Sequence, residues 1–324
     1  MKSPLVTIVT PAYNAEKWIY DALTSVSNQS TDHEHIIIDD GSTDGTAALV
    51  KSFSVIDPRV ILVQQRNYGE ATAVNLGFQK ARGKYLLVLN ADDRLAAGSI
   101  SKLSNYLAEN SAIVAVYPDW RIIDEHGVKV RSIKSAEFSH RDLLGNLMCL
   151  PGPGAMFRLI EDDDKRILRD PQYKLVSDLE FWMRLSLHGP MLRAPYELAE
   201  WREHSASQSA GGQGWNYANE IVKLSEDFFR YQPLPDSLKI EWKRAKAAAQ
   251  FIAATHKVYA KEISGRRLIL RSYWISLTSV PLIVVKSRSP LVALSIFLLP
   301  FRPRLLFRNF ITRWRKRDID SLTS

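Results

Sequence analysis

The segment Tyr85-Leu86-Leu87-Val88-Leu89-Asn90-Ala91-Asp92-Asp93 joins a short apolar run to two adjacent carboxylates. The run is typical of a buried strand, and carboxylates at its end are costly to bury without a partner. Mg²⁺ and Mn²⁺ are natural partners, because they take oxygen ligands from a few carboxylates and the rest from phosphates. The segment predicts a strand that ends in a metal site. A polar strand end turning into an ordinary loop is the alternative.

The residues before this segment alternate between strand and helix signals. Short apolar runs at 5–9, 35–38 and 60–63 predict three further strands. Apolar residues at helical spacing predict helices between them, the first with Asn14 as its cap and Glu16 in its first turn. Such alternation is typical of βαβ units, so we expect an α/β fold with a mostly parallel sheet flanked by helices.

Three of the predicted strands end in polar clusters: Pro11-Ala12-Tyr13-Asn14, Asp39-Asp40-Gly41-Ser42 and Asn90-Ala91-Asp92-Asp93. Ligands of parallel sheets bind beyond the carboxyl ends of the strands, so we expect the three clusters to converge on one crevice. Asp39 or Asp40 suits hydrogen bonding to a nucleoside, although Asp-Gly-Ser is also an ordinary turn. No GxxxxGK or GxGxxG pattern follows the first strand, which excludes a P-loop enzyme and an ordinary dinucleotide-binding fold.

Composition is that of a globular protein, with 46% hydrophobic and 24% charged residues among 324. The single Cys149 excludes an internal disulfide, and no secretory signal opens the chain, so we expect a cytoplasmic location. The net charge of +8 is unevenly distributed. Residues 266–317 carry 12 Lys or Arg and no Asp or Glu, which leaves −4 on the rest of the chain.

Several motifs follow one another in a fixed order along the N-terminal part of the chain. The first are Val6-Thr7-Ile8-Val9-Thr10-Pro11-Ala12-Tyr13-Asn14 and Ile36-Ile37-Ile38-Asp39-Asp40-Gly41-Ser42-Thr43-Asp44-Gly45-Thr46. Asn67-Tyr68-Gly69-Glu70, Ala73-Val74-Asn75-Leu76-Gly77-Phe78 and Asn90-Ala91-Asp92-Asp93 come next. In these motifs the chain resembles the inverting family 2 glycosyltransferases with the GT-A fold. The strong part of the resemblance covers residues 5–95, and weaker matches reach about residue 208.

The resemblance implies a nucleotide-diphosphate-sugar donor, with a UDP-sugar favoured. In the family, the Pro-x-Tyr-Asn and Asp-Asp-Gly-Ser segments hold the nucleoside. The late segment Trp201-Arg202-Glu203-His204-Ser205-Ala206-Ser207 resembles a further family motif, in which Arg202 would neutralise phosphate. The predicted donor-binding residues are Pro11, Tyr13, Asp39, Asp40, Gly69, Asn75, Asn90, Ala91, Asp92 and Arg202.

The family's Asp-x-Asp motif binds a divalent cation, Mn²⁺ or Mg²⁺, that bridges the diphosphate, and it maps onto Asn90-Ala91-Asp92. Such a cation neutralises charge on the departing nucleoside diphosphate. Asn90 departs from the motif, because an amide is a poorer metal ligand than a carboxylate. The predicted metal ligands are therefore Asp92, Asp93 as a second carboxylate, and His204. A surface histidine without a ligand role is the alternative for His204.

Inversion at the anomeric carbon requires a carboxylate that takes the proton of the attacking acceptor hydroxyl. The segment 177–184 resembles the family's base-bearing helix, and Asp178 is the predicted catalytic base. Ser177 stands where the family carries an acid. Glu180 competes for the role, and on a helix it is turned about 200° from Asp178. The alternative for Asp178 is a first-turn acid favoured by the helix dipole.

The resemblance divides the chain into a GT-A domain at 1–210 and a helical C-terminal region at 211–324. The uncharged stretches 272–285 and 289–301 are shorter than the roughly 20 residues of a transmembrane helix. We expect the basic tail to lie on an anionic membrane surface, at the inner face of the cell membrane, rather than to pack on the body. Its cations are interleaved with apolar runs, so we expect no nucleic-acid partner.

The sequence as a whole predicts a metal-assisted inverting glycosyltransferase. It would act on a glycan or lipid-linked acceptor in surface polysaccharide biosynthesis. Two alternatives stay open, a polyprenyl-phosphate sugar synthase and a non-catalytic nucleotide-sugar-binding module. A nucleotidyltransferase is disfavoured, because the glycine-rich loop expected after its first strand is missing from the sequence.

Overall fold

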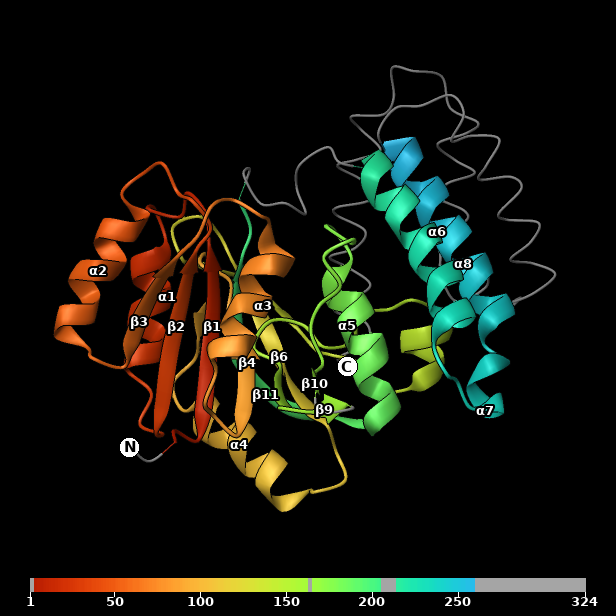
Figure 1. The fold of residues 1–324 in the computed structure, drawn as a ribbon, viewed down its shortest axis with the longest axis horizontal. Coiled ribbons are helices and arrows are strands. Elements are labelled where there is room, and N and C mark those ends of the chain that lie inside the picture. Colours follow the sequence, from red (N-terminus) through yellow and green to blue (C-terminus); the bar gives the residue numbers. More distant parts are fainter. Residues whose placement is uncertain (1–2, 163–164, 205–213, 260–324) are drawn as a thin grey trace.

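Figure 1 shows the fold in a computed structural model, which describes residues 3–162, 165–204 and 214–259. An α/β body is followed by C-terminal helices that lie beside it. The body begins with β1 (Val6–Ala12), α1 (Ile19–Ser27), β2 (His33–Asp39), α2 (Thr46–Ile56), β3 (Val60–Gln64), α3 (Glu70–Lys80) and β4 (Tyr85–Val88). It continues with β5 (Arg94–Leu95), α4 (Ser99–Glu109), β6 (Ala115–Ile123), β7 (Lys129–Ile133), a π-helical turn (Arg141–Gly145), β8 (Met156–Arg158), β9 (Glu161–Asp162), β10 (Lys165–Arg166), α5 (Ser177–Leu185), a 3-10 turn (Ser186–His188) and β11 (Met191–Arg202).

Within the described residues, a nine-stranded sheet runs in the order β3-β2-β1-β4-β8-β6-β11-β5, with β7 paired to β6. The first four strands in this order are parallel neighbours, as are β6 and β11. Strand β8 runs antiparallel between β4 and β6. The carboxyl ends of β1, β2 and β4 therefore meet at one edge of the sheet. The predicted α/β class and mostly parallel sheet are confirmed.

Burial explains why the first strands form where the apolar runs are. Strand β2 is buried along its whole length, as expected for a parallel strand covered on both faces. Helix α3 lies close against β1 because Gly77 has no side chain. A Cβ atom at Gly77 would stand 2.2 Å from Cγ1 of Val9.

The predicted cap of the first helix is wrong. Helix α1 begins at Ile19, and neither Asn14 nor Glu16 caps it. Asn14 adopts a left-handed φ of 49°, and its Oδ1 accepts a hydrogen bond from the Thr43 backbone N–H (2.8 Å). The Glu16 carboxylate accepts one from the Gly45 N–H (2.9 Å). Both side chains therefore fasten the loop after β1 to the loop after β2.

The described part of the C-terminal region is helical, as predicted. It consists of α6 (Gly214–Tyr231), α7 (Asp236–Lys239) and α8 (Trp242–Tyr259). Ile221 and Phe228 of α6 and Ala249 of α8 belong to the same hydrophobic cluster as Leu179 and Met183 of α5. These helices thus share a core with the body, and the predicted boundary near residue 210 falls among residues outside the described ones.

The predicted membrane-associating tail, residues 266–317, also lies outside the described residues. Among the helices that the structure does describe, none is long and apolar enough to cross a membrane.

Candidate functional site

A crevice of about 870 Å³ opens at the edge of the sheet where β1, β2 and β4 end. All three strand-end clusters contribute to its walls, which confirms the predicted convergence. On the opposite side, the crevice is bounded by the start of α5 and by side chains of α6 and α8. The lining residues are Pro11, Ala12, Tyr13, Asn14, Ala15, Trp18, Asp40, Asn67, Gly69, Glu70, Ala73, Asn90, Ala91, Asp92, Lys174, Leu175, Ser177, Asp178, Trp201, His204, Tyr217 and His256.

One wall of the crevice is formed by the loops after β1 and β2, where the sequence predicts the nucleoside. The Tyr13 ring is half exposed at 52%, which leaves a face for stacking. The Asp40 carboxylate accepts hydrogen bonds from the Gly69 N–H (2.8 Å) and the Tyr68 N–H (2.9 Å). Asp40 therefore holds the loop before α3 in place at the crevice wall. Gly69 adopts a φ of 90°, a left-handed conformation that favours glycine.

Asp92 reaches the crevice with its side chain 28% exposed, next to the His204 imidazole. Asp92 Oδ2 and His204 Nε2 are 2.9 Å apart. The other face of the imidazole stacks on Trp18, with ring centroids 3.9 Å apart. The loop after β4 and the residues that follow β11 thus bring the Asp92 carboxylate and the His204 imidazole together.

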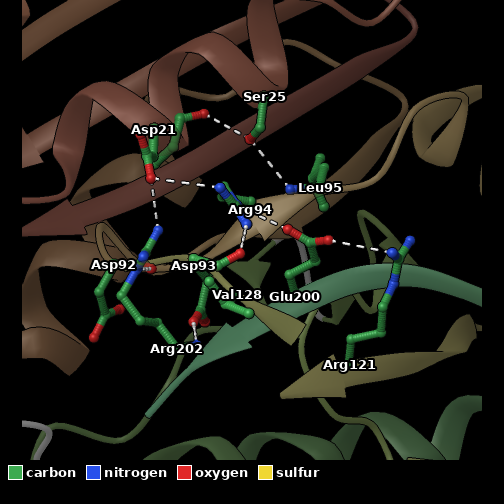
Figure 2. Close-up of polar contacts among 12 residues, drawn as sticks. Asp21, Ser25, Asp92, Asp93, Arg94, Leu95, Arg121, Val128, Glu200 and Arg202 are labelled. Carbon is green, nitrogen blue, oxygen red and sulfur yellow. Dashed lines mark hydrogen bonds and ion pairs between the residues drawn. The ribbon is translucent and has the colours of Figure 1, made fainter. Parts of the chain in front are cut away.

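Asp93 and Arg202 do not line the crevice, which corrects their predicted roles. Asp93 is 2% exposed, and its Oδ1 accepts a hydrogen bond from the Arg202 backbone N–H (2.9 Å). The Arg202 guanidinium is buried and donates to the carbonyl oxygens of Asp92 (2.8 Å) and Glu125 (3.2 Å). It also forms an ion pair of 2.7 Å with Asp21 of α1 (Figure 2). Arg202 therefore acts as a clamp that holds the backbone of the loop after β4 (residues 90–93, the acidic loop) instead of facing a phosphate.

A second arginine extends this clamp under the acidic loop. Arg94 lies between Asp21 (3.6 Å) and Glu200 (2.7 Å), and it donates to the Gly127 carbonyl in the β6–β7 turn (Figure 2). Glu200 also pairs with Arg121 of β6 at 3.5 Å. This chain of charges joins α1, the acidic loop, β6 and β11. It explains how four segments distant in sequence hold Asp92 in position.

Asp39 and Asn75 also lie outside the crevice lining, and the structure gives them other roles. The Asp39 carboxylate accepts hydrogen bonds from the Ser42 N–H and from the Gln64 side chain, both at 3.1 Å. Asn75 exchanges two hydrogen bonds of 2.8 Å with the backbone of Arg169. Asp39 builds the turn after β2, and Asn75 ties the segment before α5 to α3. Neither side chain is placed to contact a ligand in this arrangement.

Helix α5 presents Asp178 to the crevice and turns Glu180 away from it, as the helical spacing predicted. Asp178 Oδ1 accepts a hydrogen bond from the Leu179 N–H (2.7 Å), and Oδ2 lies 3.8 Å from the Cys149 sulfur. The pKa of the Cys149 thiol is raised by desolvation among the surrounding atoms and by the Asp178 charge. Glu180 is buried and bound to Arg184. Of the two candidates, only Asp178 lines the crevice.

Six lining residues lie outside the motifs found in the sequence: Ala15, Trp18, Lys174, Leu175, Tyr217 and His256. Trp18 precedes α1, and its indole N–H donates to the Glu125 carbonyl at 3.3 Å. Tyr217 and His256 lie on α6 and α8, beyond the last motif found in the sequence. The helical periodicity of these segments indicated a helix but not which face meets the crevice.

Comparisons with known proteins identify the family of the chain. The model of the family described as glycosyl transferase family 2 matches residues 7–160. An uncharacterized glycosyltransferase of Haemophilus influenzae is 32% identical over 178 residues, which are 54% of this chain and 69% of that protein. The chain belongs to glycosyltransferase family 2. This glycosyltransferase is also 29% identical over 231 residues to TuaG of Bacillus subtilis, which is named for teichuronic acid biosynthesis; the match covers 68% of this chain and 90% of TuaG.

Solved structures show the fold of this glycosyltransferase. S. aureus TarS 1-349 in complex with UDP-GlcNAc superposes with a TM-score of 0.64 at 16% identity, over 85% of this chain and 81% of that one. The mannosyltransferase PcManGT of Pyrobaculum calidifontis, in complex with GDP-Man and Mn²⁺, gives a TM-score of 0.57 at 17% identity, over 91% and 87%. The predicted GT-A fold and the predicted enzyme class are confirmed.

Proposed function

We propose that this glycosyltransferase transfers one sugar, with inversion, from a nucleotide-diphosphate-sugar to a glycan or lipid-linked acceptor in surface polysaccharide biosynthesis. The observation that carries the proposal is the shared crevice. Asp92 and the nucleoside-side loops form one part of it, and Asp178 stands on the facing helix. The relation to TuaG supports a role in surface polysaccharide synthesis.

The donor would lie along the ends of β1, β2 and β4. Pro11 and Tyr13 offer apolar and aromatic surface to the base, while Gly69 and Asn90 border the path toward Asp92. A UDP-sugar is the favoured donor. The TarS complexes with UDP-GlcNAc and with UDP support this choice. Because PcManGT binds GDP-Man, a guanine nucleotide-sugar also belongs in the binding experiment that tests the donor site.

A divalent cation fits the residues around Asp92. The described lining side chains include four carboxylates (Asp40, Glu70, Asp92 and Asp178) and a single lysine, Lys174. Such a crevice repels a diphosphate unless a cation compensates the charge. Asp92 and His204 would hold Mn²⁺ or Mg²⁺, which would neutralise the leaving nucleoside diphosphate. The Arg202 clamp keeps the Asp92 backbone in place for this role.

Asp178 would serve as the general base. It stands in the first turn of α5, where the helix dipole favours a negative charge. The acceptor hydroxyl would give its proton to Asp178 while its oxygen bonds to the anomeric carbon. The bond from that carbon to the phosphate oxygen breaks in the same step, and the nucleoside diphosphate leaves with the electron pair. Because one displacement occurs, the anomeric configuration inverts.

We also propose that residues 266–317 bind the inner face of the cell membrane and so give the protein a peripheral location there. Their 12 basic residues, interleaved with apolar stretches, suit an anionic lipid surface. Sedimentation of the full-length protein with anionic liposomes at low salt tests this point. Protein that stays in solution under those conditions contradicts it.

The donor site is tested by thermal shift with a panel of nucleotide-sugars, each with and without Mn²⁺. A ligand that binds the folded state raises its stability by mass action, by about 2.7 kcal/mol at 100 times the dissociation constant. We expect one nucleotide to raise the melting temperature of the wild type only when Mn²⁺ is present. Asp92→Ala should remove this Mn²⁺-dependent shift, while Asp178→Asn should keep it. A shift of equal size in Asp92→Ala would contradict the metal assignment.

A further inference from the structure

The wall that faces the donor side of the crevice is aromatic and comes from the C-terminal helices. The Tyr217 ring of α6 stacks on the His256 ring of α8, with centroids 4.3 Å apart and planes inclined by 30°. Both rings line the crevice. They lie outside residues 7–160, the part of the chain that the family model matches. The family resemblance therefore assigns them no role.

Contacts with α6 fix this wall relative to the predicted base. Glu220 Oε2 accepts hydrogen bonds from the backbone N–H groups of Lys174 (3.0 Å) and Leu175 (2.7 Å), just before α5 begins. The Tyr173 hydroxyl donates to Asp227 at 2.8 Å. Helix α6 is thus attached to the segment that leads into Asp178. The aromatic pair and the base are held by one rigid set of contacts.

The aromatic pair is close to Asp178 and carries no charge at neutral pH. Burial raises the pKa of Tyr217 to about 12, with the nearby Asp178 and Cys149 adding to the effect. Burial also lowers the pKa of His256. Two neutral stacked rings beside a carboxylate match the apolar C–H face of a sugar ring whose hydroxyl points at the carboxylate.

We propose that the Tyr217–His256 pair is the acceptor subsite and that it takes a neutral saccharide ring, not a bare lipid phosphate. The inference rests on the proposed function, because it names the acceptor class of the same crevice. A phosphate at this position would lie beside Asp178, and Lys174 is the one lysine or arginine among the described lining residues. Arg169, which lies before α5 and outside the lining, is paired with Glu70 at 2.8 Å.

The proposed role of Asp178 as a base also favours a saccharide acceptor over a lipid phosphate. A sugar hydroxyl must lose a proton as it attacks, so a carboxylate at the acceptor position assists it. A phosphate monoester is mostly ionised at neutral pH, so it needs no base to attack and would be repelled by the Asp178 charge. The chemistry of the crevice therefore selects a hydroxyl nucleophile.

Saturation-transfer NMR on the full chain, with UDP and the diamagnetic Mg²⁺ present, tests this subsite. The probes are methyl glycosides of glucose, galactose, mannose, rhamnose and N-acetylglucosamine, with farnesyl phosphate as the lipid-phosphate arm. We expect at least one glycoside to bind. Tyr217→Leu should weaken that binding about tenfold, and Tyr217→Phe should retain it, because the phenyl ring keeps the stacking surface. Farnesyl phosphate should not displace the glycoside.

Tyr231→Leu is the matched control, since Tyr231 lies on the same helix but is 68% exposed and outside the crevice lining. UDP affinity should stay within about threefold of wild type in all three variants, which shows that the fold and donor site are intact. The proposal is wrong if no glycoside binds, if Tyr217→Leu binds as well as wild type, or if farnesyl phosphate displaces the glycoside. Failure of the proposed function is distinct, because UDP itself would then not bind.

Discussion

Replacing Arg202 with methionine separates its observed role as a backbone clamp from the phosphate contact that the sequence predicted. The side chain is 1% exposed, and its loss leaves the Asp92 carbonyl oxygen without its donor, whereas the Glu125 carbonyl keeps the Trp18 indole N–H. Each buried unpaired group costs about 1–3 kcal/mol. The lost ion pair adds less than about 1 kcal/mol, because Asp21 is 44% exposed and keeps Arg94 nearby. We therefore expect a loss of roughly 2 kcal/mol.

The assay is thermal unfolding in buffer without nucleotide or metal. For a chain of this size, about 2 kcal/mol corresponds to a fall of roughly 4–6 °C in the melting temperature. Lys129→Ala is the matched control, because it removes a cation from an exposed pair with Glu197 (3.2 Å) and should shift the midpoint by less than about 2 °C. Arg202→Met should also lose part of the Mn²⁺-dependent nucleotide shift.

The two roles predict opposite patterns. If Arg202 contacted phosphate, Arg202→Met would keep the wild-type melting temperature without ligand and lose only nucleotide affinity. An unchanged midpoint together with a tenfold weaker nucleotide would refute the clamp.

Two further predictions concern stability. His35 is fully buried against Thr10 (2.8 Å), and burial, followed by the charge of His33, lowers its pKa to about 3. The unfolded pKa of His35 is higher, near 6.5, so the unfolded state binds more protons between pH 6.5 and 3. The free energy of unfolding should therefore fall by about 2 kcal/mol from pH 7 to pH 5. If urea titrations of His35→Gln show the same dependence on pH as wild type, His35 is not its source. Gly77→Ala should destabilise by about 1–3 kcal/mol, since its Cβ would meet Val9 Cγ1 at 2.2 Å and the clash exceeds the gain in helix propensity; an unchanged or higher urea midpoint would show that α3 can move away from β1.

The sequence was sufficient for the strands, helices and converging strand ends of the first 95 residues. Parallel strands buried on both faces are continuous apolar runs, and their polar ends must meet at one edge. The sequence could not decide which acid of an adjacent pair faces the crevice. Asp39 and Asp40 are chemically equal in sequence, but only Asp40 borders the crevice, and likewise Asp92 faces it while Asp93 is buried.

The errors have a common physical origin in tertiary packing. Arg202 follows a family motif, but the direction of its guanidinium depends on the β6–β7 turn, whose carbonyl oxygens it binds. Asn14 had the residue type of a helix cap, but the neighbouring loop supplies a better donor in Thr43. Tyr217 and His256 have no local signal, because the packing of α6 on α8 alone decides that they meet.

The central claim is that Asp178 takes the proton of an acceptor hydroxyl in a nucleotide-sugar crevice. The most direct test compares wild type and Asp178→Asn for transfer of labelled sugar from the donor found by thermal shift, with Glu180→Gln as the matched control on α5. We expect Asp178→Asn to bind the donor within about threefold of wild type and to transfer it about 10²–10⁴-fold more slowly. Glu180→Gln should retain transfer. Turnover of Asp178→Asn within threefold of wild type would contradict the account.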